Sequence, residues 1–414
     1  MKILIVNTRH YFGGGDSTYT FNLAELLRQH KHDVSFFAMQ DERNLPDPNS
    51  DLFASPIDFR ALNRRKNLAN GWQVLCRSIY SGEARAKFAR LLDRVQPDII
   101  HTQSLHGHLT PSVLMEAKAR GLPVVWTLHE YKLVCPNTHF LIDSTGVICE
   151  ACRGGRYYQA AFKRCKKGSL LASLMAALEA YTHQILRVQK QVDQFLAPSQ
   201  FLRKKLIERG FPAEKVIHLP LFLKDEQFDY SGKDAGYFLF LGRINPIKGI
   251  EVLAEAARLA PEVTVLLAGR NEGGQAENLL ANLPPNARYL GMKSGQELND
   301  LLHGARALVM PSLWYENQPF VILEAFAAGK PVIASRLGGM EELVVHQERG
   351  ILTEAGNVDQ LAEAMKFIHK GPEMCKKLGK NGFDYVKRVH SPMNHYNQLF
   401  NTYLQLLNND LTRM

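Results

Sequence analysis

A chain of 414 residues is too long for one hydrophobic core and suits two domains of roughly 200 residues each. Its hydrophobic fraction of 45% and charged fraction of 22% are typical of globular proteins and exclude a largely disordered or fibrous chain. The net charge of +9 comes entirely from the first half: residues 1–220 hold 30 Lys and Arg against 19 Asp and Glu, whereas residues 221–414 hold 20 against 22. Such a bias attracts an anionic membrane, an anionic ligand or nucleic acid, and an ordinary solvated surface explains it equally well.

The first residues predict a buried strand rather than a secretion signal. The uncharged run after Lys2 extends only from Ile3 to Asn7 before polar Thr8 and charged Arg9. No stretch of the sequence approaches the roughly 18 apolar residues of a membrane span. We therefore expect a cytoplasmic protein, which either stays free or associates peripherally with the inner face of the cytoplasmic membrane.

In chain order, the first half alternates short β-branched runs with amphipathic stretches. We expect strands at 2–6, 33–38, 99–102 and 124–128, and helices at 18–29 and 84–95. The second half starts the alternation afresh. There we expect strands at 237–241, 263–268, 307–310 and 331–334, and helices at 249–259, 295–303 and 319–328. This pattern predicts an α/β fold of two doubly wound Rossmann-like domains facing a central cleft.

The segment 218–233 has little periodicity and predicts the hinge between the two domains. We therefore expect domains at 1–220 and 221–394. A last helical stretch within 395–414 follows Ser391-Pro392, and it packs back on one domain or the other.

A glycine run, Gly13-Gly14-Gly15, follows the first strand and precedes a helix. Glycines there let the backbone approach an anion, and the helix start supplies unpaired N–H groups. The run lacks the full G-x-G-x-x-G spacing, so a plain tight turn is a comparable interpretation.

Two cations follow the first strand of the second half. Arg243 comes directly after Gly242 at the strand end, and Lys248-Gly249 opens the next helix. Cations at the carboxyl end of a strand suit a diphosphate, which Arg can bind through two hydrogen bonds at once. A surface salt bridge is the alternative for this pair taken alone.

The segment 311–326 contains two acidic residues around a helix start. Pro319 fits the first helical turn, so the amides of Phe320 and Val321 would point toward an anion. Glu316 precedes this helix, and Glu324 lies within it. Carboxylates accept hydrogen bonds from hydroxyl groups, so this pair predicts binding of sugar and ribose hydroxyls. The alternative is a pair of solvated charges at a helix end.

At these residues the chain resembles the retaining glycosyltransferases of family 4, which have the two-domain GT-B architecture. The resemblance is carried by the E-x7-E spacing of Glu316 and Glu324 and by the residues 325–334 that follow it. It extends to Gly242-Arg243, Lys248-Gly249, Gly338-Gly339 with Glu342, and 350–352. In the first half it includes 97–101 and 127–136, so nearly the whole chain is covered.

The resemblance implies an acceptor-side domain at 1–220 and a donor-binding domain at 221–394. It implies that Arg243 and Lys248 bind the diphosphate of a nucleotide sugar, that Glu316 holds the donor sugar, and that Glu324 binds the ribose. His129 corresponds to the family histidine beside the donor sugar. The remaining donor-side residues are expected to be Gly14, Gly15, Gly242, Asn317, Phe320 and Val321.

The same resemblance implies a retaining hexosyl transfer from a UDP- or GDP-sugar to a glycan or lipid-linked saccharide, in cell-envelope or exopolysaccharide synthesis. No D-x-D sequence occurs in the chain, so we expect metal-independent catalysis without a required cofactor. The family's retention is ascribed to front-face displacement assisted by a donor phosphate oxygen.

Four cysteines have the spacing C-x13-C-x2-C-x12-C. Cys135, Cys149, Cys152 and Cys165 lie in an insert at about 135–168. Four thiolates that include a C-x2-C pair can form a closed zinc site, and reduced thiols in ordinary packing are an equal alternative.

Three further side chains are candidates for acceptor contacts: His101, His106 and Glu130. His106 and His108 lie close together but lack a carboxylate in their pattern, so we favour cleft-lining roles over a metal cluster. The basic amphipathic stretch 59–80 either meets a membrane surface or faces the core.

Other functions fit the sequence less well. A catalytically silent nucleotide-sugar-binding protein at the membrane is the main alternative, and the intact set of acidic and basic site residues disfavours it. The basic groups are scattered and lack an RNP-type or helix-turn-helix pattern, so we do not expect nucleic-acid binding. The incomplete glycine fingerprint disfavours a dinucleotide-dependent oxidoreductase.

Overall fold

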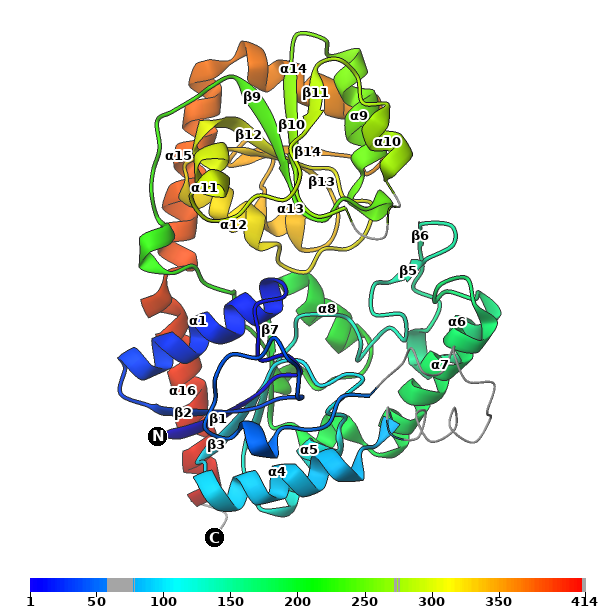
Figure 1. The fold of residues 1–414 in the computed structure, drawn as a ribbon, viewed down its shortest axis with the longest axis vertical. Coiled ribbons are helices and arrows are strands. Elements are labelled where there is room, and N and C mark those ends of the chain that lie inside the picture. The colour runs from blue at the N-terminus through cyan, green and yellow to red at the C-terminus, as the bar shows by residue number, and fades with distance from the viewer. Residues whose placement is uncertain (58–76, 78, 272–273, 275, 412–414) are drawn as a thin grey trace. The chain divides into compact units, whose positions relative to one another are not determined.

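The computed structural model describes residues 1–57, 77, 79–271, 274 and 276–411 (Figure 1). The chain divides into two compact units. The first comprises Met1–Pro198, Leu202–Leu219 and the described part of Tyr396–Met414, and the second comprises Ser199–Phe201 and Pro220–His395. The predicted boundaries at 220/221 and 394/395 each lie one residue from the main passages between the units.

The first unit is built on a six-stranded, all-parallel sheet of order β2-β1-β3-β4-β7-β8. Its strands are β1 (Lys2–Val6), β2 (Asp33–Phe37), β3 (Ile99–Thr102), β4 (Val124–Thr127), β7 (Gln194–Ala197) and β8 (Val216–His218). In β1, the four residues after Lys2 are all buried, because helices cover both faces of a parallel sheet.

The helices of the first unit follow its strands in the alternating manner that the sequence predicted. They are α1 (Gly15–Gln29), α4 (Gly82–Val95), α5 (Ser112–Ala119), α6 (Tyr158–Phe162), α7 (Leu170–Ile185), most of α8 (Gln200–Glu208) and most of α16 (Pro392–Leu411). The start of α4 is capped by Ser81, whose hydroxyl accepts the amide of Ala84 at 3.1 Å.

The C-terminal helix α16 packs on the first unit. The Tyr403 hydroxyl lies 2.6 Å from Nδ1 of His101 on β3, and the Tyr396 ring stacks on His30 with centroids 3.6 Å apart. Aromatic contacts therefore attach the last helix to both the sheet and the end of α1.

A long connection between β4 and β7 contains the cysteine-bearing insert. It holds a small antiparallel hairpin, β5 (Leu141–Ile142) and β6 (Val147–Ile148), followed by α6 and α7. These elements stand together at one side of the unit, on the opposite side from α16 (Figure 1). The basic triplet 64–66 and nearly all of the stretch 59–80 lie outside the described residues.

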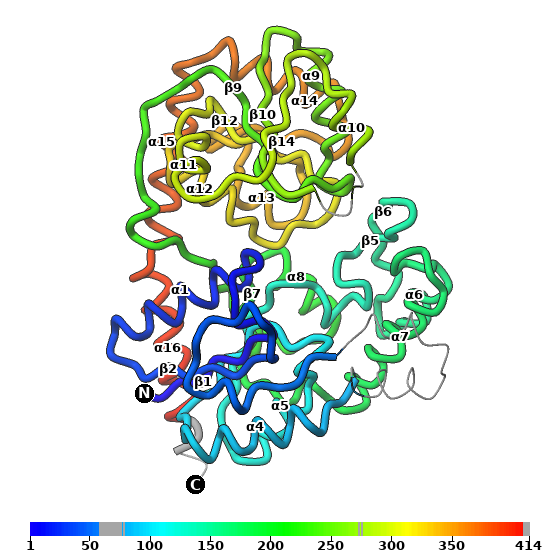
Figure 2. The backbone as a smooth tube through the Cα atoms, viewed as in Figure 1, coloured from blue at the N-terminus to red at the C-terminus, as the bar shows by residue number. Residues whose placement is uncertain are grey.

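The second unit has a six-stranded parallel sheet of order β11-β10-β9-β12-β13-β14. Its strands are β9 (Tyr237–Leu241), β10 (Thr264–Ala268), β11 (Ala287–Tyr289), β12 (Ala305–Met310), β13 (Val332–Ser335) and β14 (Gly350–Thr353). Its helices are α9 (Ile250–Leu259), α10 (Glu277–Ala281), α11 (Gly295–Gly304), α12 (Phe320–Ala327), α13 (Gly339–Leu343), α14 (Val358–Lys370) and α15 (Pro372–Val389). Figure 2 traces the same path as a continuous tube.

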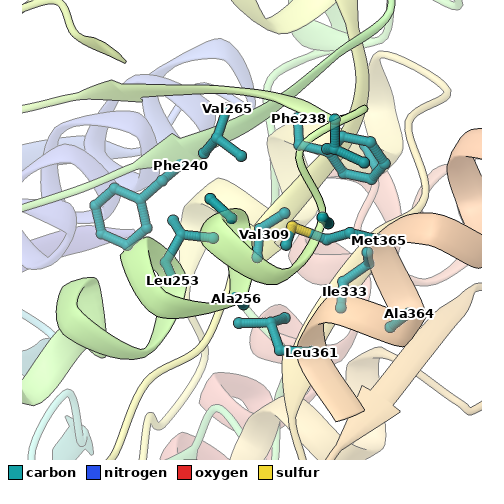
Figure 3. Close-up of a cluster of buried hydrophobic side chains, with 14 of the residues drawn as sticks. Phe238, Phe240, Leu253, Ala256, Val265, Val309, Ile333, Leu361, Ala364 and Met365 are labelled. Atoms are coloured by element: carbon teal, nitrogen blue, oxygen red, sulfur yellow. The ribbon is translucent and has the colours of Figure 1, made fainter. Parts of the chain in front are cut away.

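The core of the second unit lies on both faces of this sheet. Side chains alternate along β9, so Phe238 and Phe240 pack on one face with Leu253 of α9 and Met365 of α14 (Figure 3). The intervening Leu239 packs on the other face in a cluster with α12. The predicted pair of Rossmann-like α/β units is thus confirmed. No helix among the described residues is long and apolar enough to cross a membrane.

Candidate active site

In the second unit, the loops after β9 and β12 bring the predicted donor-binding residues together. The strand order reverses between these neighbours, because the chain proceeds from β9 outward to β11 and then returns to β12 on the other side. Ligands of open α/β sheets bind beyond the carboxyl ends of the strands at such a reversal. Arg243 and Lys248 follow β9, and Glu316 follows β12.

Glu316 is held by several polar contacts. One of its carboxylate oxygens, Oε1, lies 2.5 Å from the Lys248 ammonium and accepts hydrogen bonds from the Ser312 hydroxyl at 2.9 Å and the Trp314 indole at 2.7 Å. The Lys248 ammonium also lies 5.1 Å from the centroid of the Trp314 ring. The Glu316 residue is only 7% exposed, so these contacts fix both the carboxylate and the lysine.

A glycine makes the close approach of the two loops possible. Gly249, directly after Lys248, has φ of +73°, and a Cβ atom added there would lie 1.9 Å from the carbonyl oxygen of Pro311. Only glycine tolerates both the left-handed backbone and this packing. The Lys248–Gly249 turn can therefore lie directly against the loop that carries Glu316.

The helix start expected for anion binding is present, with one correction. Pro319 is the residue before α12 and has extended ψ of 117°, so it is the N-cap and not a residue of the first helical turn as predicted. Its carbonyl accepts the amide of Ile322 at 3.1 Å. The amides of Phe320 and Val321 have no acceptor among the described residues, so they are available to an anion.

Glu324 differs sharply from Glu316 although both belong to the same E-x7-E element. It lies in α12, and no described side chain or backbone amide donates a hydrogen bond to its carboxylate. Burial raises the pKa of the Glu324 carboxyl above its ordinary value. This half-buried carboxylate is therefore free to accept hydroxyl groups of a ligand.

The remaining predicted residues of this unit have mixed environments. Arg243 is exposed after Gly242, whose φ is +150°. The Asn317 side-chain oxygen accepts the Ser199 hydroxyl at 2.6 Å, so in this structure the amide braces the loop.

Glu342, in the first turn of α13, accepts hydrogen bonds from backbone amides that could not be predicted from its sequence motif. It accepts the backbone amides of Gln200 at 2.9 Å and Phe201 at 3.4 Å, two residues that group with the second unit. Burial raises its pKa to about 7, although these amides act in the opposite direction.

In the first unit, His129 follows β4 and lies beside Gln103, which follows β3. The two side chains are 2.8 Å apart, between Nε2 of His129 and Oε1 of Gln103. The edge of the Tyr19 ring from α1 packs on the imidazole, with centroids 5.3 Å apart. Burial lowers the pKa of His129 to about 4, against a smaller opposing effect of Asp16. The ring is thus neutral at pH 7, and with Nε2 donating to Gln103 its Nδ1 is an acceptor.

The glycine run before α1 has a different arrangement from the one expected for a phosphate loop. The amides of Gly13 and Gly14 both donate to the Ser17 hydroxyl, at 2.9 and 3.1 Å. These two N–H groups are therefore occupied within the protein. Gly15 begins α1 itself.

His101 lies in the core and not at an acceptor surface. It is fully buried, with Nδ1 bound to Tyr403 at 2.6 Å and Nε2 bound to Thr127 at 2.8 Å. Both ring nitrogens are thus satisfied by the protein, which corrects the predicted acceptor contact. The ring of His108 is likewise occupied, because its Nδ1 accepts the amide of Ile57 at 3.1 Å.

His106 and Glu130 do lie together, 3.7 Å apart between Nε2 and Oε1. Burial raises the pKa of Glu130 to about 6, and burial together with Lys132 and His183 lowers the pKa of His106. The buried Nδ1 of His106 and the buried Nε2 of His183 have no hydrogen-bond partner within the ranges that the structure describes. This polar cluster is completed by a 2.6 Å ion pair between Lys132 and Glu179. Its members on α7, Glu179 and His183, were not predicted, because no motif or periodic pattern marks them.

The four cysteines of the insert approach one another. All are free thiols, and Cys135 and Cys165 are buried. Burial, followed by the charges of the other three, raises the pKa of Cys152 to about 12. Among the described residues, however, no group of three or more histidine, cysteine or acidic side chains is arranged to hold a metal ion. Zinc therefore stays a prediction beside reduced packing thiols, and metal analysis of the purified protein distinguishes the two.

Two protein-family models match this chain and show the family to which it belongs. The model described as Glycosyltransferase Family 4 matches residues 13–226, more than half of the chain, and the model described as Glycosyl transferases group 1 matches residues 224–385. The chain belongs to glycosyltransferase family 4. The two matches meet where the chain passes from the first unit to the second.

Several relatives are similar to this family 4 glycosyltransferase. An "Uncharacterized 42.6 kDa protein in cps region" of Klebsiella pneumoniae is 24% identical over 83% of this chain and 87% of its own length. The amylovoran biosynthesis glycosyltransferase AmsK of Erwinia amylovora is 28% identical over 47% of this chain and 52% of its own. An Escherichia coli UDP-Gal:alpha-D-GlcNAc-diphosphoundecaprenol alpha-1,3-galactosyltransferase is 30% identical over 37% of this chain and 43% of its own.

Solved structures share the GT-B fold of this family 4 glycosyltransferase. HepE of Anabaena in complex with UDP-glucose has a TM-score of 0.66 and 17% identity, covering 98% of this chain and all of the other. Sucrose-phosphate synthase from Thermosynechococcus elongatus has a TM-score of 0.71 and 20% identity, covering 99% of both chains. At these identities the likeness establishes the fold alone.

Proposed function

We propose that this family 4 glycosyltransferase is a retaining enzyme that moves a sugar from a UDP- or GDP-sugar to a glycan or lipid-linked saccharide. The proposal includes a role in cell-envelope or exopolysaccharide synthesis. The names of the relatives from Erwinia amylovora and Escherichia coli and the UDP-glucose complex of HepE support this choice of substrates.

The observation that carries the proposal is the contrast between the two glutamates of the second unit. The Glu316 carboxylate is held by Lys248, Ser312 and Trp314, whereas Glu324, in the helix that follows, has no hydrogen-bond donor among the described residues. A carboxylate without a partner in a half-buried position is costly unless a ligand supplies donors. Ribose hydroxyls are such donors, so Glu324 binds the ribose of the donor in this proposal.

The diphosphate is received by cations and amides in this proposal. Lys248, Arg243 and the free amides of Phe320 and Val321 lie on the loops after β9 and β12 and supply positive charge where the leaving group develops negative charge. These groups need no metal ion to neutralise the diphosphate. His129, neutral at pH 7, accepts a hydroxyl of the donor sugar through Nδ1.

The transfer step follows a front-face displacement. The bond between the anomeric carbon and the diphosphate oxygen breaks while the acceptor oxygen forms its bond to the same face of that carbon. The proton of the acceptor hydroxyl passes to a phosphate oxygen of the departing nucleoside diphosphate. Glu316 and Glu324 orient the donor and take no proton in this scheme.

Acceptor binding belongs to the first unit in this proposal. In this proposal Glu130, whose side chain is 43% exposed, offers its carboxyl group to saccharide hydroxyls, and the neighbouring His106 positions it. The protein acts in the cytoplasm, with peripheral association at the inner face of the membrane that holds a lipid-linked acceptor.

The experiment is a panel of UDP- and GDP-sugars tested for thermal stabilisation of the protein and for slow hydrolysis. We expect one nucleotide sugar to raise the melting temperature and to be hydrolysed. Lys248→Ala should remove the thermal stabilisation and lower the hydrolysis rate by about 10²-fold or more. Lys366→Ala is the matched control, because Lys366 pairs with Glu363 on the surface of α14. Binding without hydrolysis or transfer would favour the catalytically silent alternative, and no binding by any donor would overturn the proposal.

A further inference from the structure

Exposed apolar side chains are concentrated on α6 and α7. Among the described residues, 17 large hydrophobic side chains are exposed, and seven of them lie between residues 158 and 185. They are Tyr158, Phe162, Leu170, Leu171, Leu174, Leu178 and Ile185. Scattered exposed apolar residues are ordinary, but seven within 28 consecutive positions, on two helices that pack on each other, are a concentration typical of an interaction surface.

The five members on α7 form a single face. At 3.6 residues per turn, positions 170, 171, 174, 178 and 185 fall within an arc of about 100°. The residues that α7 buries against the protein lie on the opposite side of the helix: Ser173, Ala176, Ala177, Ala180 and His183. The helix thus packs on the protein through small side chains and turns its leucines outward, the reverse of an ordinary surface helix.

The segment that leads into α7 is strongly cationic. Residues 151–178 contain six Lys and Arg and no Asp or Glu. Arg156, Lys163, Arg164 and Lys167 form no ion pair with any described acidic side chain, and all four are exposed. Phe162, which is 82% exposed, lies directly before Lys163.

From this combination we infer that the outward face of α7 and the 162–167 turn form a docking surface for an anionic lipid bilayer. Outward leucines lie at the boundary of headgroups and acyl chains when a helix lies in the plane of a membrane, and adjacent cations contact acidic headgroups. The inference deepens the peripheral association of the proposed function by assigning its surface. It does not depend on which nucleotide sugar the enzyme uses.

The positive charge beside α7 favours an anionic lipid surface over a second copy of this chain as the partner. Two copies facing each other through α7 would bring together two sets of the four exposed cations that have no described acidic partner, which disfavours self-association. An acidic lipid surface neutralises the same cations while it covers the leucines. The α7 helix has 16 residues, so it fits the interface plane rather than a membrane span.

Vesicle flotation of the full chain tests the inference. The probes are vesicles of phosphatidylcholine alone and vesicles of equal parts phosphatidylcholine and phosphatidylglycerol. We expect binding only to the anionic vesicles and weakening by at least about tenfold in each of two triple variants. The first is Leu171→Gln with Leu174→Gln and Leu178→Gln, and the second is Lys163→Gln with Arg164→Gln and Lys167→Gln.

A matched control replaces three exposed apolar residues of the second unit: Leu259→Gln, Met292→Gln and Phe367→Gln. It should float with anionic vesicles as the unaltered protein does. All variants should keep their melting temperature and their donor hydrolysis in vesicle-free buffer, so loss of docking is separable from failure of the donor assignment.

Three results would overturn the inference. The unaltered protein could fail to bind anionic vesicles, or both triple variants could bind as well as it does. Alternatively, sedimentation equilibrium could show a dimer that the leucine variant dissociates, which would assign the face to a second copy of the chain.

Discussion

Lys248 and Glu316 form a 2.5 Å ion pair between the loops that follow β9 and β12 of the second sheet. Both side chains are largely buried, with 12% and 9% exposure. The pair joins two neighbouring strands at the reversal of strand order, so it fixes the geometry of the proposed donor site before any ligand arrives.

Breaking this pair from one side should destabilise the second unit. Glu316→Gln leaves the Lys248 ammonium without its carboxylate, which should lower the free energy of unfolding by about 2–4 kcal/mol. Lys248→Met should cost a similar amount. The double variant should cost much less than the sum, because neither charge is then left unpaired. Urea unfolding of the unaltered protein, the two single variants and the double variant measures this coupling. Additive losses of stability would contradict a stabilising interaction between Lys248 and Glu316.

Glu324 should behave in the opposite way. Since no residue in the described part of the chain donates to its half-buried carboxylate, Glu324→Gln should leave the free energy of unfolding at pH 7 unchanged or slightly raised. The same change should weaken donor binding about tenfold or more through lost hydrogen bonds to the ligand. Urea unfolding and nucleotide-sugar titration check the two expectations. A loss of stability with normal donor binding would make Glu324 a structural residue.

Glu342 should make the stability of the second unit depend on pH. Its pKa is raised from 4.5 to about 7 in the folded protein, so folding favours its protonated form. This contribution is fully present below pH 4.5 and is lost as pH rises through 7. Glu342→Gln should therefore flatten the fall in stability between pH 4.5 and 7. Thermal unfolding across this range measures the slope, with Glu341→Gln, an exposed neighbour, as the control.

Gly249 should tolerate no side chain. In Gly249→Ala the new Cβ would lie 1.9 Å from the Pro311 carbonyl oxygen, and the backbone has φ of +73°. We expect loss of the folded second unit or displacement of Lys248 with loss of donor binding. Gly232→Ala is the control, because no atom lies within 4 Å of its added Cβ. Normal stability and donor binding in Gly249→Ala would contradict the close approach of the two loops.

Much of the fold could be predicted because local patterns and burial agree. The strand predicted at 237–241 was found within the same bounds, since its five apolar residues pack on both faces of a parallel sheet. The short β11 and the 194–197 strand were not predicted, because such short runs differ little from loop sequence. Helix α7 was also missed, because its leucines lie on the exposed face and its buried face consists mainly of small residues.

The placement of two predicted site residues could be derived from one motif, while their roles in donor binding stay predictions. The spacing of Glu316 and Glu324 defined a loop residue and a helical residue around a helix start, as found. Contacts between residues far apart in the sequence could not be predicted. The hydrogen bond between His101 and Tyr403 depends on how α16 packs on β3, and no pattern near either residue indicates it. For the same reason Lys248 could be predicted as a diphosphate-binding cation, but its ion pair with Glu316 could not be predicted.

The most direct test of the account is the anomeric configuration of the sugar that the enzyme releases from its preferred nucleotide sugar. Proton NMR of the first hydrolysis product, recorded before mutarotation, reports that configuration. Front-face displacement predicts the same anomer as in the donor, at a rate that Lys248→Ala lowers by about 10²-fold or more. Release of the opposite anomer, or an unchanged rate in Lys248→Ala, would contradict it.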